Sequence, residues 1–435
     1  MRKTLLLIFL QFCAARVFAQ KTLTDNGAWC WFSDPRAVYA DAAGTRVITG
    51  WVTRQGDIRA AMLDAASGKV DTVTLYDKLE VDDHDNPAFA ILPDKRILAL
   101  YTWHGRNQEP KGVIQNITEK PLDVVTFGRP TVFKPRTDSL VALYKKDTYT
   151  YANPFVLSEE QNKLYCFGRW VGYKPNMITS TDNGASWSAP KVIITSKTPD
   201  ANNRPYVKYY SDGKSRIHMV FTDGHPAAEA LNSVYYCYYE KNAFWRADGT
   251  RICTVDALPF HPSDATVVYK ATPETGKAWI FDVAADRRGQ PVILYSRYPT
   301  DDQHQYYYAS FNGKSWEDHK ICDAGKWFPK TPAGQKEREV NYSGGMTIDP
   351  ASPGNIYFSH QIDGVFEISR GYTRDAGRTW VISPITRNSQ LDNVRPVVPR
   401  NKTSKNKTIL LWMQNRCYLH YTDYDVRILY KIIEP

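Results

Sequence analysis

The chain has 435 residues and a formal net charge of +9, and 43% of its residues are hydrophobic, 13% aromatic and 23% charged. This is the composition of a globular protein, so it excludes a disordered or collagen-like chain. The only long apolar stretch is at the N-terminus, which excludes a multi-span membrane protein. Length alone would suggest two or three domains, although β-propellers fold chains of this size as one closed unit.

The N-terminus has the pattern of a secretory signal peptide. Two basic residues precede the apolar run Leu5–Phe12, and Val17–Ala19 fits the small-x-small pattern before a cleavage site at Gln20. The run is too short for a membrane anchor, and the residues before Cys13 are a poor lipoprotein signal. We therefore expect residues 1–19 to be removed and the mature protein, residues 20–435, to be periplasmic or secreted without a membrane span.

The mature chain keeps a mild basic excess. The signal peptide carries three positive charges and no acidic residue, so its removal lowers the net charge from +9 to +6. A nucleic-acid-binding protein usually shows dense clusters of Lys and Arg, which this chain lacks. The excess instead fits a local cationic groove for an acidic substrate, and we expect a monomer with no nucleic-acid partner.

The cysteines give no metal-binding or redox motif. None of them forms a Cys-x-x-Cys pair, which excludes a zinc ribbon and a thioredoxin motif. An oxidising compartment permits disulfides, and a bond between Cys30 and Cys417 could join the two ends of a closed ring. After the signal peptide the chain contains Cys30, Cys166, Cys237, Cys253, Cys322 and Cys417.

One strand pattern recurs seven times along the mature chain. Each copy is an apolar run, a turn rich in Gly, Asp, Pro or Asn, and a second apolar run, which is the signature of a β-hairpin. The paired runs are Pro35–Ala40 and Val47–Val52, Pro87–Leu92 and Ile97–Trp103, Ala152–Leu157 and Lys163–Trp170, Pro205–Tyr210 and Arg216–Thr222, Ala278–Val283 and Pro291–Arg297, Ser343–Ile348 and Ile356–Gln361, and Arg395–Val398 and Thr408–Met413.

An outer, aromatic-rich strand pair follows each hairpin, and two of the outer turns carry an Asp box. Ser180–Trp187 and Thr373–Trp380 fit the pattern S/T-x-D-x-G-x-x-W of sialidase-like propellers, and Ser310–Trp316 is a degenerate copy. The Asp of the box accepts backbone hydrogen bonds and the Trp packs between blades, so the box is structural. Ring closure would bury the apolar face that each unit exposes alone. We predict an all-β fold, a single seven-bladed β-propeller of four-stranded antiparallel blades.

The hairpins bring chemically active side chains together at their open ends. Positions paired in an antiparallel hairpin have a constant index sum, so His84 lies opposite His104 and Tyr151 beside Arg169. Equivalent strands of a propeller run the same way relative to the axis, so the open ends share one face. The other ends carry ordinary turn residues. The same reasoning places Arg204, Tyr206, Asp223, His225, Arg297, His360 and Arg36 at this mouth.

This cluster suits the removal of a proton alpha to a uronate carboxylate. The reaction needs a base with a near-neutral pKa, an acid for the leaving oxygen and a cation for the developing negative charge. His84 or His104 suits the base, and Arg169 can pair bidentately with the carboxylate. Tyr151 can donate to the leaving oxygen, or act as the base if Arg169 lowers its pKa. Asn86 and Asn153, Arg204, Tyr206, His225 and Arg297 are candidate substrate-binding residues.

Each of these residues also has a structural interpretation. A Tyr in the run Tyr144, Tyr149 and Tyr151 can serve packing alone, and Asn before Pro is a common start of a strand. Convergence at adjacent hairpin ends favours the functional interpretation. His218, His225 and Cys237 are close enough in sequence to bind zinc but lack a motif spacing, so the metal ligands stay unknown. We expect no required cofactor, with a structural Ca or Zn ion as an alternative.

Four segments of the sequence resemble the secreted propellers with BNR repeats. They are Trp29–Ala37, Asp82–Pro87, Arg204–Tyr209 and Phe221–Pro226. That family includes ulvan lyases and rhamnosyl-glucuronate enzymes of gut Bacteroidetes. Its lyases use two histidines on one blade followed by a Tyr and an Arg on the next, an order that His84, His104, Tyr151 and Arg169 match. The resemblance implies that one His and Tyr151 transfer the protons and that Arg169 neutralises the uronate.

The leading hypothesis is therefore a lyase that cleaves a rhamnose–glucuronate linkage of an acidic glycan by β-elimination. The first alternative is an α-L-rhamnosidase, since some relatives resemble hydrolases with a His near the N-terminal Trp-rich motif on the opposite face. The mature chain has no His before His84, which disfavours that alternative. A sialidase would need an early Phe-Arg-Ile-Pro motif, which is absent. The third alternative is a non-catalytic glycan-binding propeller.

Overall fold

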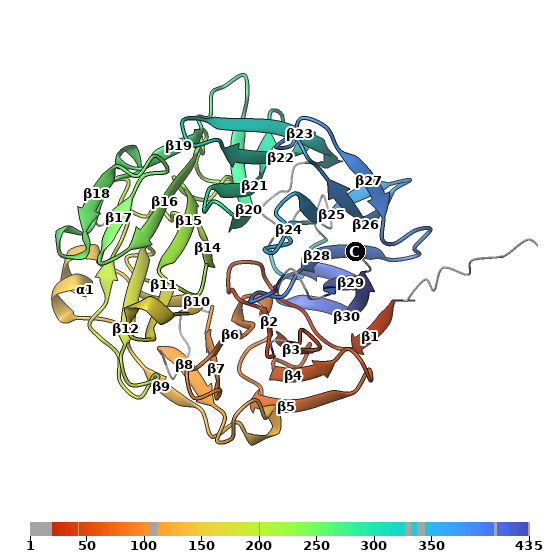
Figure 1. Ribbon diagram of the computed structural model, residues 1–435, viewed down its shortest axis with the longest axis horizontal. Helices are drawn as coiled ribbons and strands as arrows, with labels where there is room; N and C mark the ends of the chain where they lie inside the picture. The colour runs from red at the N-terminus through yellow and green to blue at the C-terminus, as the bar shows by residue number, and fades with distance from the viewer. Residues whose placement is uncertain are drawn as a thin grey trace, which may run out of the picture.

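Seven antiparallel sheets stand in a ring around a central axis, and the chain passes from blade to blade in sequence order (Figure 1). The structure is a computed structural model that describes residues 20–41, 43–104, 111–199, 201–326, 332–336, 344–403 and 407–433. The prediction of a seven-bladed β-propeller is confirmed. The signal peptide, residues 1–19, lies outside the described residues, so its cleavage stays a prediction.

The first three blades each contain four consecutive strands, ordered from the axis outwards (Figure 1). Their inner hairpins coincide with the first three hairpins of the sequence prediction. The strands are β2 (Ala37–Tyr39), β3 (Arg46–Val52), β4 (Ile58–Asp64) and β5 (Val70–Tyr76); β6 (Ala88–Ile91), β7 (Ile97–Thr102), β8 (Val113–Ile117) and β9 (Thr131–Phe133); and β10 (Asp147–Leu157), β11 (Lys163–Val171), β12 (Pro175–Ser180) and β13 (Lys191–Val192).

The fourth blade departs from the four-stranded prediction. Its sheet has six strands, because the outer hairpin β17–β18 is followed by β19, which pairs with the free stretch of β16. The strands are β14 (Val207–Ser211), β15 (Arg216–Thr222), β16 (Val234–Glu240), β17 (Ala243–Trp245), β18 (Arg251–Thr254) and β19 (Thr266–Tyr269).

The fifth and sixth blades return to four strands. These strands are β20 (Lys277–Ala285), β21 (Pro291–Tyr298), β22 (His304–Phe311) and β23 (Trp316–Gly325), and β24 (Met346–Ile348), β25 (Asn355–Ile362), β26 (Val365–Tyr372) and β27 (Val381–Pro384). The two Asp boxes lie between the outer strands of the third and sixth blades. In the first box, Ser186 N–H donates to Asp182 at 2.9 Å and Trp187 stacks on Phe133, so its structural role is confirmed.

The seventh blade closes the ring with both ends of the chain. It contains β28 (Asp392–Val397), β29 (Thr408–His420), β30 (Asp423–Ile433) and, as its outermost strand, β1 (Lys21–Thr24). Lys21 pairs with Tyr430 in this contact, which no local sequence pattern could have indicated. The N-terminal strand thereby replaces the covalent bond considered between Cys30 and Cys417. All six cysteines of the described residues are free.

Helical structure is confined to the loops. The helix α1 (Asp138–Tyr144) begins at Thr137, whose side chain accepts a hydrogen bond from Leu140 N–H, and ends at Lys145 in the left-handed region. The sequence analysis missed it, because seven residues give too short a periodic pattern. Five 3-10 turns complete the described elements: η1 (Asp83–Asp85), η2 (Val124–Thr126), η3 (Ser158–Glu160), η4 (Val255–Ala257) and η5 (Pro262–Asp264). No helix in the described part of the chain is long and apolar enough to cross a membrane.

The segment between β1 and β2 runs into the middle of the ring (Figure 1). Residues 27–40 are all buried there. The indole N–H of Trp29 donates to the carbonyl of Arg395 at 3.3 Å, and that of Trp31 donates to Ile280 at 3.3 Å. The ammonium of Lys208 donates to the Trp31 carbonyl and forms an ion pair with Asp34. This central segment is therefore held by several blades at once.

Candidate active site

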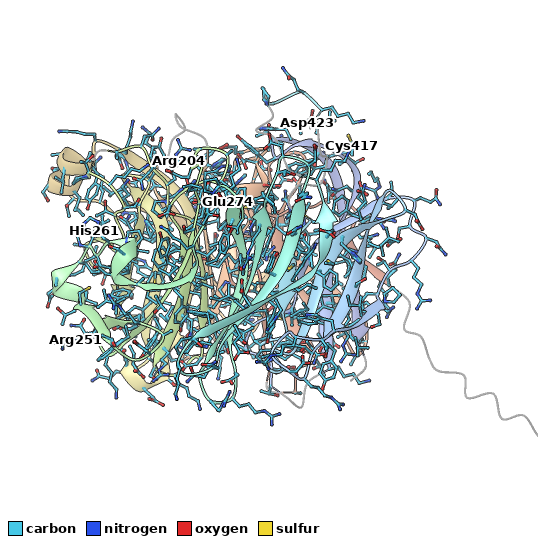
Figure 2. The ribbon with its side chains drawn as sticks, turned by 90° about the horizontal axis from the view of Figure 1, so that it is seen from above. Arg204, Arg251, His261, Glu274, Cys417 and Asp423 are labelled. Atoms are coloured by element: carbon cyan, nitrogen blue, oxygen red, sulfur yellow. The ribbon has the colours of Figure 1, made fainter. Side chains whose placement is uncertain are left out.

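A cavity of about 570 Å³ opens on one face of the ring, as large as typical small-molecule sites. Loops and strands of the second, third, fourth, fifth and seventh blades line it together with the central segment. Figure 2 shows the ring from the side. Arg204, which lines the cavity, lies near the same face as Asp423, the neighbour of the lining residue Thr422. Arg251 lies towards the opposite face. Among the sequence-predicted residues, the lining includes His84, His104, Tyr151, Arg169, Arg204, Tyr206 and His225.

Two stacked histidines form one end of the cavity floor. The rings of His84 and His104 lie 4.1 Å apart with planes 13° from parallel. Asp82 joins them, since one carboxylate oxygen bonds Nδ1 of His84 at 2.6 Å and the other bonds Nδ1 of His104 at 2.7 Å. Both Nδ1 atoms are thereby engaged, which leaves both Nε2 atoms for other partners.

The local sequence explains this arrangement. Asp82 is the N-cap of η1, and its side chain accepts the backbone N–H of His84 at 2.9 Å. His104 follows the end of β7, which pairs with β6 directly after η1. The hairpin therefore fixes both histidines around one buried carboxylate, as the index sum predicted for the histidines themselves. The sequence analysis named Asp82 only as the start of the segment Asp82–Pro87 and gave it no role in the site.

The two imidazoles differ in pKa. Burial alone would lower the pKa of His84, but the nearby Cys30 and the Asp82 carboxylate outweigh burial and raise it well above its ordinary value. Burial lowers the pKa of His104, and the charge on His84 adds to this effect against the opposing attraction of Asp82. Near neutral pH the pair therefore carries one positive charge, on His84, while His104 is neutral.

Tyr151 lies beside this pair in a strained backbone conformation. Its ring centroid is 6.0 Å from that of His84, and its φ angle is +65°, in the left-handed region that non-glycine residues rarely adopt. The register of β10 against β11 shifts on either side of Thr150, which marks a bulge at this point. Strained residues of this kind cluster at functional sites.

The phenol of Tyr151 is hard to ionise. Burial raises its pKa well above the ordinary value, with a further contribution from Tyr206, and the positive charges of His84 and Arg169 do not compensate. Arg169 does lower the pKa of Tyr151, as the sequence analysis considered, but burial has the larger effect. The desolvation of a 6% exposed phenol outweighs the attraction of the neighbouring cations.

Arg169 lines the cavity and has no carboxylate partner among the described residues. Its guanidinium is sandwiched between the rings of Tyr151 and Tyr206, at 4.9 and 4.6 Å from their centroids. Although Arg169 is only 5% exposed, its Nε and Nη1 have no hydrogen-bond partner among the described residues. A buried cation with two open donors is costly unless a ligand completes it, and a carboxylate is a suitable anionic acceptor for a guanidinium.

The opposite wall is aromatic and cationic. His225 lies edge-on to Trp279 at 4.5 Å, and Tyr206 lies 5.4 Å from His225. Arg204 stacks 4.3 Å from the ring centroid of Tyr173. Trp279 was missed by the sequence analysis because it lies within a strand that reads as core. Trp279 reaches the cavity because the fifth blade packs against the fourth.

Asn86 and Asn153 do not point into the main cavity. The side-chain oxygen of Asn86 accepts the backbone N–H of Cys30 at 3.1 Å, and that of Asn153 accepts the backbone N–H of Asp34 at 2.9 Å. Both amides are almost fully buried. They hold the central segment in place, so their placement does not support direct contact with substrate.

Three further residues predicted at the mouth lie elsewhere. Arg297 is enclosed by Tyr269 and Tyr307, at 4.1 and 3.8 Å from their ring centroids, and pairs with Asp318. Arg36 is buried in the centre and pairs with Asp34 at 2.9 Å. His360 bonds the hydroxyl of Ser369 at 3.0 Å. These three residues sit at strand ends, as predicted, but their side chains turn towards blade interfaces or the axis.

The zinc trio considered from the sequence does not assemble. Nδ1 of His218 bonds the hydroxyl of Tyr236 at 2.6 Å, while His225 lines the cavity. Within the described ranges, two other groups bring metal-binding atoms together: Cys30, Asp83 and His84, and Asp82, His84 and His104. Both groups lie at the histidine end of the cavity.

Comparisons with known proteins agree with this architecture. A solved structure of an ulvan lyase, a polysaccharide lyase of family PL25 bound to -[GlcA(1-4)Rha3S]-, superposes with a TM-score of 0.68 at 14% identity over 94% of this chain and 95% of that chain. The polysaccharide lyase Uly1 superposes with a TM-score of 0.57 at 11% identity over 94% and 97% of the two chains. At such identities the likeness concerns the fold.

The sequence comparisons give the family. A search of curated proteins finds no significant match. Residues 47–324, more than half of the chain, match the family described as "BNR repeat-containing family member". The match runs from the first blade to the end of the fifth and includes His84, His104, Tyr151 and Arg169. The protein therefore belongs to the BNR repeat-containing family.

Proposed function

We propose that the protein is a glycan lyase that cleaves a rhamnose–glucuronate linkage by β-elimination. The observation that carries this proposal is the guanidinium of Arg169, buried with two open donors beside a histidine pair and a protonated tyrosine. A uronate carboxylate would pair with this guanidinium through charge-assisted hydrogen bonds. The same contact would stabilise the negative charge that develops when the neighbouring C5–H bond breaks.

The proton transfers can be assigned by charge. His104 is neutral, so its Nε2 suits removal of the C5 proton. The C5–H electrons then form the C4–C5 double bond as the C4–O bond breaks, and Tyr151 donates its proton to the leaving oxygen. The imidazolium of His84 adds a second positive charge to the floor of the site. The proposed mechanism uses this chain's own side chains for every step.

The cavity suits a short acidic glycan. The aromatic wall of Tyr206, Trp279 and His225 can pack against sugar faces, and Arg204 offers a further cation at the rim. Two solved lyases share the fold, and the ulvan lyase was observed with a ligand that contains GlcA and Rha3S. These features support the glucuronate–rhamnose linkage as the first substrate to test, with the mature protein acting in the periplasm or outside the cell.

One assay tests the reaction class. The purified mature protein is incubated with a rhamnosyl-glucuronate oligosaccharide, and the ultraviolet absorbance of the C4–C5 double bond is followed alongside free rhamnose. A rise in absorbance with rhamnose release is expected. Rhamnose without absorbance would identify a hydrolase, and substrate binding without products would identify a glycan-binding protein. Full lyase activity of His104→Ala would refute the assignment of the base.

A further inference from the structure

The thiol of Cys30 lies against the histidine end of the cavity. Cys30 is 1% exposed and lines the cavity through the central segment. Its backbone N–H donates to the carbonyl of Asp83 at 2.7 Å and to the side chain of Asn86 at 3.1 Å. Two hydrogen bonds thus fix this cysteine on η1, the turn that carries His84. The proposed elimination makes no use of this thiol.

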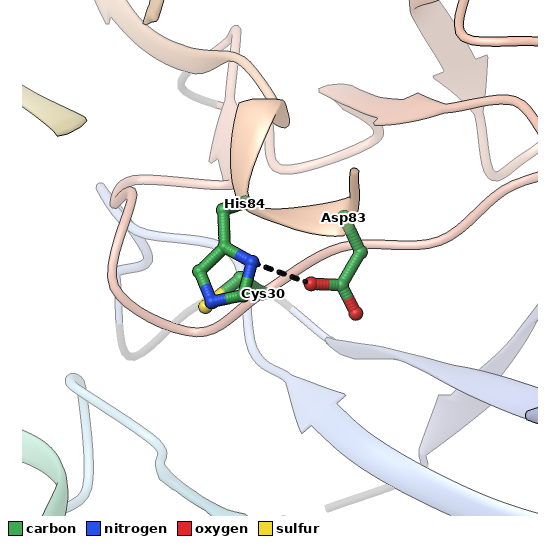
Figure 3. A group of neighbouring side chains, drawn as sticks. All are labelled: Cys30, Asp83 and His84. Carbon is green, nitrogen blue, oxygen red and sulfur yellow. Dashed lines mark ion pairs between the residues drawn. The ribbon is translucent and has the colours of Figure 1, made fainter. Parts of the chain in front are cut away.

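Three kinds of metal-binding atom meet at this point. The sulfur of Cys30, a carboxylate oxygen of Asp83 and a ring nitrogen of His84 all lie within 4.8 Å of one another. Figure 3 shows the three side chains converging, with Oδ1 of Asp83 3.2 Å from Nδ1 of His84. In a tetrahedral zinc site, Zn–N and Zn–S bonds of about 2.0–2.3 Å separate the ligand atoms by about 3.5 Å. Small shifts of the side chains, with loss of the hydrogen bond between Nδ1 of His84 and Asp82, would therefore bring the three atoms to coordination distance.

The surroundings hold the carboxylate in position. Oδ2 of Asp83 accepts hydrogen bonds from Nη1 of Arg395 at 2.5 Å and from the hydroxyl of Tyr418 at 2.6 Å. These two partners leave Oδ1 directed towards His84. Hydrogen bonds of this kind around a metal site orient the ligands and raise affinity. Asp82 and His104 form a second metal-capable group that shares His84, so further donors lie next to the trio.

We propose that Cys30, Asp83 and His84 form a binding site for a thiophilic divalent cation, with Zn²⁺ as the best match. Thiolate, imidazole and carboxylate are the ligand types that zinc prefers, and a calcium site would instead need six or more oxygens. On binding, the Zn–S bond replaces the S–H bond of Cys30 and the Zn–N bond replaces an N–H bond of the His84 imidazolium, and both protons leave to solvent. A fourth position stays open towards the cavity, because Cys30 and His84 both line it.

This inference does not depend on the proposed lyase activity, because metal binding is measured without substrate. Metal-free protein is titrated with Co²⁺ and, in competition with a chromophoric chelator, with Zn²⁺. One equivalent of Co²⁺ is expected to bind and to give the charge-transfer absorption of a thiolate–cobalt bond. Cys30→Ser should abolish that absorption and weaken Zn²⁺ binding by more than the roughly 10–100-fold that loss of an outer-shell partner costs.

A matched control and a second measurement keep the test decisive. Cys417→Ser changes an exposed cysteine and should leave both signals unchanged. In the unmodified protein, Zn²⁺ should protect Cys30 but not Cys417 from alkylation by iodoacetamide, as read by mass spectrometry, so the test survives poor folding of the variant. Absence of Co²⁺ binding, equal binding by Cys30→Ser, or equal alkylation of Cys30 with and without Zn²⁺ would overturn the proposal. If the lyase assay succeeds, Zn²⁺ should inhibit it by occupying His84.

Discussion

The ring of His84 stacks on the ring of His104 at 4.1 Å, although twenty residues of blade two separate them. Asp82 is the reason that two imidazoles can lie so close, since its two oxygens bond one histidine each. The buried carboxylate balances the single positive charge that the pair carries. Its role is comparable to that of an aspartate that orients a catalytic histidine, extended to two rings.

Asp82→Asn should therefore impair turnover more than substrate binding. An amide offers one acceptor and one donor, so it cannot accept from both Nδ1 atoms. We expect kcat to fall by about 10²–10⁴-fold, the usual contribution of positioned acid–base groups, with a smaller change in KM. Steady-state kinetics on the oligosaccharide measure this. Asp349→Asn is the matched control, since Asp349 is also buried and paired, with Lys402, away from the cavity; an equal loss of kcat in both variants would contradict the role given to Asp82.

The substitution Arg169→Lys should distinguish the contribution of the positive charge from that of the planar guanidinium. Lysine keeps the positive charge but lacks the planar fork that bonds a carboxylate with two hydrogen bonds. We expect kcat/KM to fall by roughly 10²–10³-fold. The same substitution at Arg297, which is enclosed by Tyr269 and Tyr307, should leave the kinetic constants of the folded enzyme unchanged. The assignment of the carboxylate site fails if Arg297→Lys is the more damaging variant.

Tyr151→Phe should remove the proton donor and keep the ring. Because the hydroxyl carries the proposed proton for the leaving oxygen, we expect kcat to fall by about 10²-fold. The loss should be smaller on a substrate whose leaving group needs no proton, such as one with a good aryl leaving group. Tyr144→Phe tests a buried tyrosine of the same stretch that does not line the cavity. Equal activity of both variants would remove Tyr151 from the mechanism.

Stability should fall in mild acid because of buried histidines. Burial lowers the pKa of His304 to about 3, from about 6.5 when it is unfolded, and neither ring nitrogen has a partner among the described residues. Between these two values the unfolded chain binds the extra proton, so stability is complete above pH 6.5 and is lost as the pH falls towards 3. Each such histidine lowers the free energy of unfolding by up to about 1.4 kcal/mol for every unit by which the pH falls between these two values.

Denaturant titrations from roughly two pH units below the pKa of the unfolded histidine to roughly one unit above it measure that slope. His304→Phe, which fits among the rings of Phe281, Tyr298 and Tyr306, should reduce the slope. His261→Gln changes an exposed histidine and should not. His218, whose pKa burial lowers to about 4, contributes in the same direction and should preserve part of the slope in the His304 variant. An unchanged slope in His304→Phe would show that other groups dominate.

The hairpin pattern predicted much of this site, because antiparallel pairing fixes which positions lie opposite each other. It placed His84 by His104 and Tyr151 by Arg169 without knowledge of the other blades. It failed for Arg297 and Arg36, since an index sum gives the position along a strand and not the side to which the residue points. It also failed for Asn86 and Asn153, whose partners belong to the central segment.

The position of the central segment could not be predicted from local sequence patterns. Trp29 bonds the carbonyl of Arg395, and Lys21 pairs with Tyr430, so its position depends on contacts between the two ends of the chain. Residues such as Cys30 and Trp31 read as core in the sequence, and they become cavity lining because the segment lies inside a closed ring. The alternation of inward and outward residues along a strand does not indicate that a neighbouring segment lies inside the ring.

Removal of residues 20–24 should expose the edge of β30 and lower the melting temperature. The lost contacts are the β1–β30 hydrogen bonds and the buried side chain of Leu23. A thermal unfolding curve, compared with that of a chain starting at Gln20, measures the change. An unaltered melting temperature would mean that β1 does not hold the ring together.

The route of the central segment through the ring also sets when activity can arise. Residues 30–32 form part of the cavity, and the same stretch of chain is anchored through β1 on the last blade to be synthesised. Residues 21–32 therefore reach their final positions only after the seventh blade exists. A partly folded chain with six finished blades would still lack one wall of its cavity, so enzymatic activity would report on molecules that have completed the ring.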